Sequence, residues 1–134
     1  MISYTTVGVN DLPRALGFYG PLFEEMGLDQ CFLDQTSASW GRRGDASFTR
    51  FSIGYPFDGL PASVGNGTMT AFLIDAPARI DRLHELALAN GGRDDGAPGR
   101  RPHYGGSFYG AYVRDPDGNK LAFICHDSVP PDGV

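Results

Sequence analysis

The sequence predicts an α+β fold built from two copies of one strand–helix–strands module. Three observations predict it: a repeat that relates the two halves, a strand followed by a helix at the start of each half, and three strand-like runs after each helix. The 134 residues fit one domain of ordinary size. We expect module one at about residues 1–55, a linker at about 56–67 and module two at about 68–128.

The repeat relates positions that are 64 residues apart, which is close to half the chain. Residues of the same kind recur where each predicted strand gives way to a helix and where each helix ends. The matched positions are Asp11 with Asp75, Pro13 with Pro77, Leu16 with Ile80, and Gly27 with Gly91. A sequence with this repeat favours two similar modules over one continuous fold.

Each half begins with an apolar strand, at residues 5–9 and 70–74, and then reaches an Asp-x-Pro step. The Asp or the residue after it can cap a helix, and Pro fits the first helical turn, where its missing N–H is not needed. Apolar residues at helical spacing follow in both halves. Glycine after each helix suits the left-handed C-terminal position. The Gly20-Pro21 step predicts a kink or a break in the first helix.

Strand-like runs follow each helix. We expect them at about 28–34, 37–43 and 46–54 in the first half, and at about 92–96, 108–114 and 119–126 in the second. The segment 115–119, Asp-Pro-Asp-Gly-Asn, predicts a hairpin turn because Pro presets one turn dihedral and Gly supplies the positive φ. Residues 94–107 are predicted to form a long loop of the kind that often lines a binding site. The tail at 129–134 is expected to be loosely held.

Composition and charge argue against two classes of partner. The net charge is −5 and no run of basic residues is longer than a pair, whereas nucleic acid demands a basic face. No apolar run approaches the roughly 18 residues of a membrane span, and no leader pattern begins the chain. We therefore expect a cytoplasmic protein that binds neither nucleic acid nor a membrane.

The chain resembles the vicinal oxygen chelate superfamily, which includes glyoxalases, bleomycin resistance proteins and extradiol dioxygenases. The resemblance rests on the two βαβββ modules, the helix start at residues 11–19 and the hairpin at 115–119. Residues 91–104 and 109–114 resemble a bacterial glyoxalase-like subgroup. The resemblance implies curled mixed sheets around a cleft, helices on the outside and a homodimer.

The resemblance also implies where a metal site belongs. Metal enzymes of the superfamily place a His on the first strand, a His on the first strand of module two and a Glu on the last strand. Carried over, these positions hold Tyr4, Met69 (or Thr68 by the repeat offset) and Ala122. Met and Ala cannot replace an imidazole or a carboxylate on a divalent ion, and Tyr binds such ions only occasionally. The sequence predicts that this metal site is absent, and we expect no cofactor.

Aromatic, cationic and imidazole side chains on the predicted strands and the long loop are candidates for binding a small molecule. The candidates are Tyr4, Trp40, Phe48, Arg50, Met69, Arg101, His103, Tyr104, Tyr112 and His126. The loop cluster of Arg101, His103 and Tyr104 suits an anionic or carbonyl group. Arg50, if it lies on a concave face, would seek a carboxylate ligand or an Asp partner.

Each candidate has a plainer interpretation. Core packing is the alternative for the aromatic strand residues and Met69, and solvent exposure is the alternative for Arg50. A surface loop fixed by ordinary hydrogen bonds is the alternative for the loop cluster around His103. A relocated site that uses His103 and His126 stays open. His84 is expected to be a solvated surface residue, because it is placed off the apolar stripe of its helix.

Three functions remain. The first is a metal-free domain of this superfamily that binds a small, partly apolar molecule. The second is an active lyase, isomerase or dioxygenase that uses displaced ligands for a divalent metal or acid–base groups. The third is a non-catalytic dimerisation module whose cleft is filled by its own aromatic residues. No Gly-x-Ser-x-Gly or phosphate-binding loop is present, and no catalytic residue can be named.

Overall fold

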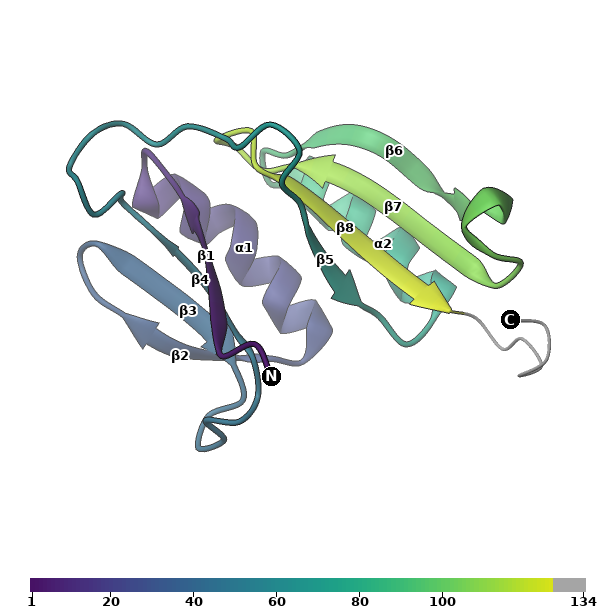
Figure 1. Ribbon diagram of the computed structural model, residues 1–134, viewed down its shortest axis with the longest axis horizontal. Helices are drawn as coiled ribbons and strands as arrows, with labels where there is room; N and C mark the ends of the chain where they lie inside the picture. Colours follow the sequence, from purple (N-terminus) through teal and green to yellow (C-terminus); the bar gives the residue numbers. More distant parts are fainter. Residues whose placement is uncertain (127–134) are drawn as a thin grey trace. The chain divides into compact units, whose positions relative to one another are not determined.

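The computed structural model describes residues 1–126, so the predicted tail and the last residues of module two lie outside the described part. Two helices and two mixed sheets of four strands confirm the predicted α+β class with its βαβββ modules (Figure 1). The elements are β1 (Tyr4–Gly8), α1 (Leu12–Met26), β2 (Asp29–Leu33), β3 (Ser37–Gly41), β4 (Arg50–Gly54), β5 (Thr70–Leu73), α2 (Pro77–Ala89), β6 (Arg93–Arg100), the 3₁₀ helix η1 (Pro102–Tyr104), β7 (Phe108–Arg114) and β8 (Lys120–His126). Within residues 1–126, neither helix is long and apolar enough to cross a membrane.

Both sheets have the same topology. Sheet A has the order β1-β4-β3-β2, and sheet B has the order β5-β8-β7-β6. In each sheet the first strand runs parallel to the last strand of its module, and the remaining pairs are antiparallel. Figure 1 shows each helix on one face of its own sheet. The repeat seen in the sequence is therefore a repeat of strand order as well.

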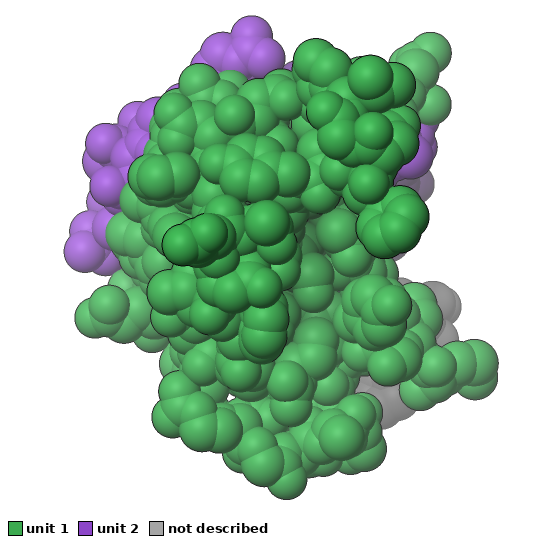
Figure 2. All heavy atoms as spheres, turned by 90° about the vertical axis from the view of Figure 1, so that its left-hand side faces the viewer, with its two compact units in different colours: residues 1–66, 116–119 green, residues 67–115, 120–134 purple. Residues whose placement is uncertain are grey.

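The chain folds as two compact units. Unit 1 comprises residues 1–66 together with 116–119, and unit 2 comprises residues 67–115 together with the chain from 120 onward. Figure 2 shows one face of the molecule with unit 1 in green and unit 2 in purple. The turn 116–119 belongs to unit 1 because Asp117 Oδ1 accepts hydrogen bonds from the Asn10 N–H at 3.0 Å and from Arg14 Nη2 at 2.8 Å.

Unit 1 has a core of aromatic side chains between α1 and sheet A. Phe23 of α1 stacks on Trp40 of β3 with ring centroids 4.8 Å apart, and Tyr19 lies 5.3 Å from Phe51 of β4. The helix begins where Asp11 Oδ1 accepts a hydrogen bond from the Arg14 N–H at 3.0 Å, as the capping pattern predicts. It ends before a glycine with φ 74°.

The first helix does not break at Pro21. It runs from Leu12 to Met26 with this proline inside. The hydrogen bond that proline omits would go to the carbonyl of Gly17, and Gly17 is exposed, so water can satisfy that carbonyl.

Unit 2 has a mainly aliphatic core between α2 and sheet B, which also holds the ring of Phe123. Ile80, Leu83 and Ala87 of α2 are fully buried, as are Val113 of β7 and Leu121 of β8. The predicted surface position of His84 is wrong: the side chain is buried, and its Nε2 lies 2.9 Å from Asp94 Oδ1. The reason is helical geometry, because His84 follows Ile80 by four residues and so shares its buried face.

Strand β6 replaces much of the predicted loop at 94–107. It extends from Arg93 to Arg100 and pairs with β7 through two register shifts, on either side of Gly96. These shifts and the glycines remove the alternation by which a strand is recognised in a sequence. The strand predicted at 46–54 is also shorter. A turn occupies its first residues, where the carbonyl of Asp45 accepts a hydrogen bond from the Phe48 N–H, so regular strand pairing begins only at Arg50.

Candidate functional site

The two faces of sheet B carry different side chains, because successive residues of a strand point to opposite sides. On β8, Leu121, Phe123 and Cys125 are buried on the side of α2. Lys120 and Ile124 have the opposite parity and face away from that helix. The two faces of sheet B therefore differ, with the apolar core on the side of α2 and Lys120 among the residues of the other face.

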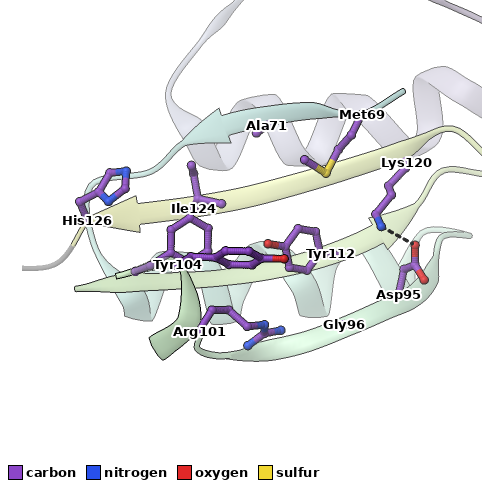
Figure 3. A pocket seen from close by; sticks show the side chains of 11 residues that line it. Met69, Ala71, Asp95, Gly96, Arg101, Tyr104, Tyr112, Lys120, Ile124 and His126 are labelled. Carbon is purple, nitrogen blue, oxygen red and sulfur yellow. Dashed lines mark ion pairs between the residues drawn. The ribbon is translucent and has the colours of Figure 1, made fainter. Parts of the chain in front are cut away.

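A pocket of about 730 Å³ lies on this face, and every residue that lines it belongs to unit 2. Apolar and aromatic side chains make up most of the lining, and a few charged groups stand among them (Figure 3). The lining residues are Met69, Ala71, Asp95, Gly96, Arg101, Tyr104, Phe108, Tyr112, Lys120, Ile124 and His126. We call this cavity the sheet-B pocket.

Small residues make room for the pocket across the middle of the sheet. In register, Ala71 of β5 lies beside Ala122 of β8, and Ala122 lies beside Tyr112 of β7. Tyr112 in turn pairs with Gly96 of β6, where an added Cβ would come within 2.9 Å of the Tyr112 ring. Gly96 has φ 151°, a conformation that L side chains rarely adopt. The ring of Tyr112 therefore lies against bare backbone, with alanines on its other side.

Two cations lie near the ring of Tyr112. The guanidinium carbon of Arg101 is 5.6 Å from the ring centroid, and Lys120 Nζ is 5.4 Å from it. Figure 3 shows Tyr112 between these side chains. Both distances are within the range of a cation–π interaction, so the ring helps to hold both positive charges at the pocket.

The cations of the pocket are only partly neutralised. Asp95 pairs with Lys120 at 3.6 Å and also accepts a hydrogen bond from Arg114 Nε at 3.0 Å. Arg101 Nη2 instead donates to the carbonyl of Ala97 at 2.7 Å. Among residues 1–126, no carboxylate pairs with Arg101, so its side chain is fixed in place and still carries an uncompensated charge.

Aromatic rings form the other end of the pocket. His103 lies on Tyr104 with ring centroids 4.1 Å apart, Tyr104 is 5.3 Å from Phe108, and Phe108 is 5.7 Å from His126. His103 does not line the pocket itself. It supports the ring of Tyr104, which does. The rings of Tyr104 and Phe108 thus lie between His103 of η1 and His126 of β8.

Sequence comparison identifies the family of this fold. Residues 34–123 match the sequence model of the Glyoxalase/Bleomycin resistance protein/Dioxygenase superfamily. The chain belongs to this superfamily. The predicted resemblance is therefore confirmed at the level of the family.

Solved structures of the superfamily agree with this assignment. A glyoxalase/bleomycin resistance protein from Albidiferax ferrireducens is 35% identical, with a TM-score of 0.81 over 93% of this chain and 98% of that one. A glyoxalase-related enzyme from Fulvimarina pelagi is 22% identical (TM-score 0.71; 93% and 87% covered). A lactoylglutathione lyase from Agrobacterium tumefaciens is 23% identical (TM-score 0.62; 93% and 92% covered), and these last two show the fold alone. A comparison with curated proteins gave no match.

The positions to which the resemblance assigns metal ligands hold Tyr4, Met69 and Ala122. Ala122 is fully buried on the pocket side of β8, Met69 lines the pocket, and Tyr4 is exposed on β1. None of these side chains supplies an imidazole or a carboxylate. Within residues 1–126, no group of three His, Cys, Asp or Glu side chains is placed to hold a metal ion.

The structure brings some of the predicted site residues together and leaves others apart. Met69, Arg101, Tyr104, Tyr112 and His126 all line the sheet-B pocket. That they bind a ligand stays a prediction. The remaining candidates apart from His103, namely Tyr4, Trp40, Phe48 and Arg50, belong to unit 1.

In unit 1 the plainer interpretation holds for Trp40, which is buried in the core against α1. Phe48 lies under the guanidinium of Arg42, whose carbon is 4.7 Å from the ring centroid. Arg50 pairs with Tyr4 in register, and its Nη2 donates to the carbonyl of Arg42 at 3.2 Å. The acceptor found for Arg50 among residues 1–126 is thus a backbone carbonyl, and a carboxylate ligand for it stays a prediction.

Sequence reasoning missed several lining residues: Ala71, Asp95, Gly96, Phe108, Lys120 and Ile124. Alternation was the available signal for some of them. Phe108 has the same parity as Tyr112 on β7, and Lys120 and Ile124 have the same parity as His126 on β8. Asp95 and Gly96 had no such signal, because their irregular strand resembles a loop.

Hydrogen bonds outside the pocket hold β6 in position. Asp94 Oδ1 lies 2.9 Å from His84 Nε2 and accepts the Gly96 N–H at 3.1 Å. The bond from His84, followed by the bond from Gly96, lowers the pKa of the Asp94 carboxyl. These contacts tie the strand that carries Gly96 to α2, on the far side of the sheet from the pocket.

Proposed function

We propose that this member of the superfamily binds a small, partly apolar molecule in the sheet-B pocket and does so without the divalent ion of its metal-dependent relatives. The observation that carries the proposal is the pocket itself. Its volume of about 730 Å³ falls in the usual range for small-molecule sites, and its apolar lining holds a few polar groups. The absence of an imidazole or carboxylate at Tyr4, Met69 and Ala122 supports the part of the proposal that concerns metal.

The lining supports binding over self-filling. The aromatic side chains Tyr104, Phe108 and Tyr112 line the pocket, and a cavity of about 730 Å³ remains beside them. A dimerisation module with a filled cleft would place such rings across the cavity. The homodimer and the cytoplasmic location stay predictions.

A screen by thermal denaturation tests the proposal. A specific binder raises the unfolding temperature by mass action, so we would screen aromatic and electrophilic small molecules against the purified chain. The variant Ala71→Trp fills the pocket from β5, where Ala71 lines it and is exposed. Ala89→Trp makes the same change at an exposed position of α2 and is the matched control.

We expect stabilising compounds to act on the wild type and on Ala89→Trp, and to lose their effect on Ala71→Trp. A compound whose stabilisation survives in Ala71→Trp binds elsewhere and contradicts the proposal. Elemental analysis of the purified protein tests the remaining part. Stoichiometric zinc, nickel, manganese or iron bound to the chain would show that the metal-free proposal is wrong.

A further inference from the structure

We infer that the ligand of the sheet-B pocket carries a carboxylate or a similar oxyanion, which Arg101 binds, and an apolar, ring-containing body that lies along the aromatic wall. This inference rests on the proposed function, because it names the class of molecule that the same pocket takes.

Arg101 is held in place by groups that do not neutralise it. Its Nη2 donates to the carbonyl of Ala97 at 2.7 Å, and its Nη1 donates to the carbonyl of Arg100 at 3.4 Å. A guanidinium has five N–H donors, and within residues 1–126 the other three have no protein acceptor. Carbonyls orient the group without adding a negative charge. An oxyanion is the acceptor that completes such a fork, with charge-assisted hydrogen bonds.

The backbone around Arg101 fixes where its side chain lies. Its own N–H donates to the carbonyl of Phe108 at 3.0 Å, which fixes the start of the side chain beside β7. Two glycines lie under the guanidinium: an added Cβ would meet Arg101 Nη2 at 3.5 Å from Gly96 and Nη1 at 3.3 Å from Gly99. The guanidinium therefore rests on bare strand β6 with its orientation set before a ligand arrives, so binding costs little ordering.

The charge at this end of the pocket is positive although the chain has a net charge of −5. Arg101 and Lys120 both line the pocket, and Asp95 is the only carboxylate among the lining residues. Asp95 is shared between Lys120 and Arg114. An anion is therefore attracted here by a local surplus of positive charge and not by the charge of the whole molecule.

The rest of the pocket suits an apolar body. Ile124 and Met69 supply aliphatic surface. Tyr104 and Phe108 supply ring faces and edges, and Phe108 pairs with His126 at the end of β8 away from Lys120. A free inorganic anion would leave this surface uncovered, and an uncharged hydrocarbon would leave Arg101 without an acceptor. A ring-containing carboxylate satisfies both parts of the lining.

The experiment compares 2-naphthoate with its uncharged analogue 2-naphthamide by calorimetric and NMR titration of the full chain. Arg101→Gln removes the proposed anchor. Arg100→Gln is the matched control: it removes the same charge from the neighbouring residue, whose guanidinium carbon lies 5.6 Å from the Tyr109 ring on the side of α2. We also use Arg101→Lys, which keeps the charge but loses the planar fork.

We expect 2-naphthoate to bind more tightly than the amide. Arg101→Gln should weaken naphthoate binding about ten- to hundredfold, Arg101→Lys should weaken it less, and Arg100→Gln should leave it within about twofold. Unfolding temperatures of the variants show whether each is folded. If Arg101→Gln does not fold, the test rests on Arg101→Lys.

The failures of the two proposals differ. If acid and amide bind equally, if Arg101→Gln changes neither, and if Ala71→Trp abolishes both, the pocket binds small molecules and the anionic inference is overturned. If naphthoate binding survives in Ala71→Trp, both proposals fail. If benzoate, phenylacetate and naphthoate all fail to bind the wild type, the inference for ring-containing carboxylates is overturned, while the library screen still decides the proposed function.

Discussion

The two sheets have the same strand order, but they differ in where their aromatic clusters lie. In sheet A, Trp40 and Phe51 face α1 and pack with Phe23. In sheet B, Phe108 and Tyr112 face away from α2 and line a pocket, and the side toward the helix holds aliphatic residues together with Phe123 and Tyr109. The same backbone topology therefore places rings in different surroundings. A shift of one residue along a strand moves a side chain to the other face of the sheet, and so decides whether a ring lies in the core or at the pocket.

The faces away from the helices differ as well. In sheet A the positions of this parity hold small hydroxyl residues, namely Ser39 and Ser52, which pair in register, together with Arg50 and Tyr4. In sheet B they hold rings, alanines and two cations. Arginine is present on both faces: Arg50 bonds to the carbonyl of Arg42, and Arg101 bonds to the carbonyl of Ala97. Only Arg101 lies beside a described pocket with an aromatic wall.

Truncating one ring in each sheet gives the largest expected contrast. Trp40→Ala removes a ring that is 3% exposed and should destabilise the protein by about 3–5 kcal/mol, the usual cost of such a cavity. Tyr112→Ala should cost far less stability, because its ring lies at an open pocket, and should instead weaken binding of any compound found in the screen. Denaturant unfolding and titration of the same two variants measure both effects. Equal losses of stability would show that Tyr112 is a core residue.

Glycines sharpen the same contrast at the level of the backbone. Gly96→Ala should destabilise by about 1–3 kcal/mol, because its φ is 151° and the new Cβ would come within 2.9 Å of the Tyr112 ring. Gly17→Ala in α1 is the control: nothing lies within 4 Å of the new Cβ, and alanine should stabilise the helix by about 0.5–1 kcal/mol. Thermal unfolding of the two variants checks the opposite signs. If Gly96→Ala left the unfolding temperature unchanged, β6 would not be held against Tyr112.

The sequence was sufficient to predict the fold because its signals are local. Asp11 as a cap, Pro13 in the first turn and Gly27 in the left-handed position each act within a few residues, and the repeat doubles the evidence. The run predicted at 92–96 was too short for β6, which extends to Arg100, because Gly96 and the register shifts beside it destroy the alternation that identifies a strand. His84 was predicted to lie on the surface but is buried, because neighbouring positions along a helix can differ between a buried and an exposed face.

The pocket was only partly predictable for a related reason. Residues with distinctive chemistry, such as Tyr112 and Arg101, stand out in a sequence. Ala71 and Gly96 line the pocket because they have little or no side chain, and this role depends on which residue lies across the sheet. Lys120 resembles an ordinary charged residue after a turn until the register places it beside Tyr112.

The bond between α2 and β6 predicts a pH dependence at the acidic end. The pKa of Asp94 is lowered in the folded state, so its contribution to stability is present above the ordinary value of 3.8 and is lost as pH falls through the lower folded value. Asp94→Asn should therefore be less stable than the wild type at neutral pH, and the difference should shrink below pH 3.8. Thermal unfolding from neutral to acidic pH measures this. Glu85→Gln, on the exposed side of α2, should show no such convergence.

The smallest expected effect is at the alkaline end, on the α2 side of the same sheet. Tyr109 donates a hydrogen bond to Asp81 at 2.6 Å, and this bond, followed by burial, raises the pKa of the phenol to about 12. A raised pKa means that the stabilisation is present below pH 10.0 and is lost as pH rises toward 12. Because solvent screens this partly exposed pair, Tyr109→Phe should cost at most about 1 kcal/mol at neutral pH. Unfolding curves of the wild type and the variant should converge above pH 10.0, and curves that stay apart there would show that the Asp81 bond is not what stabilises the neutral phenol.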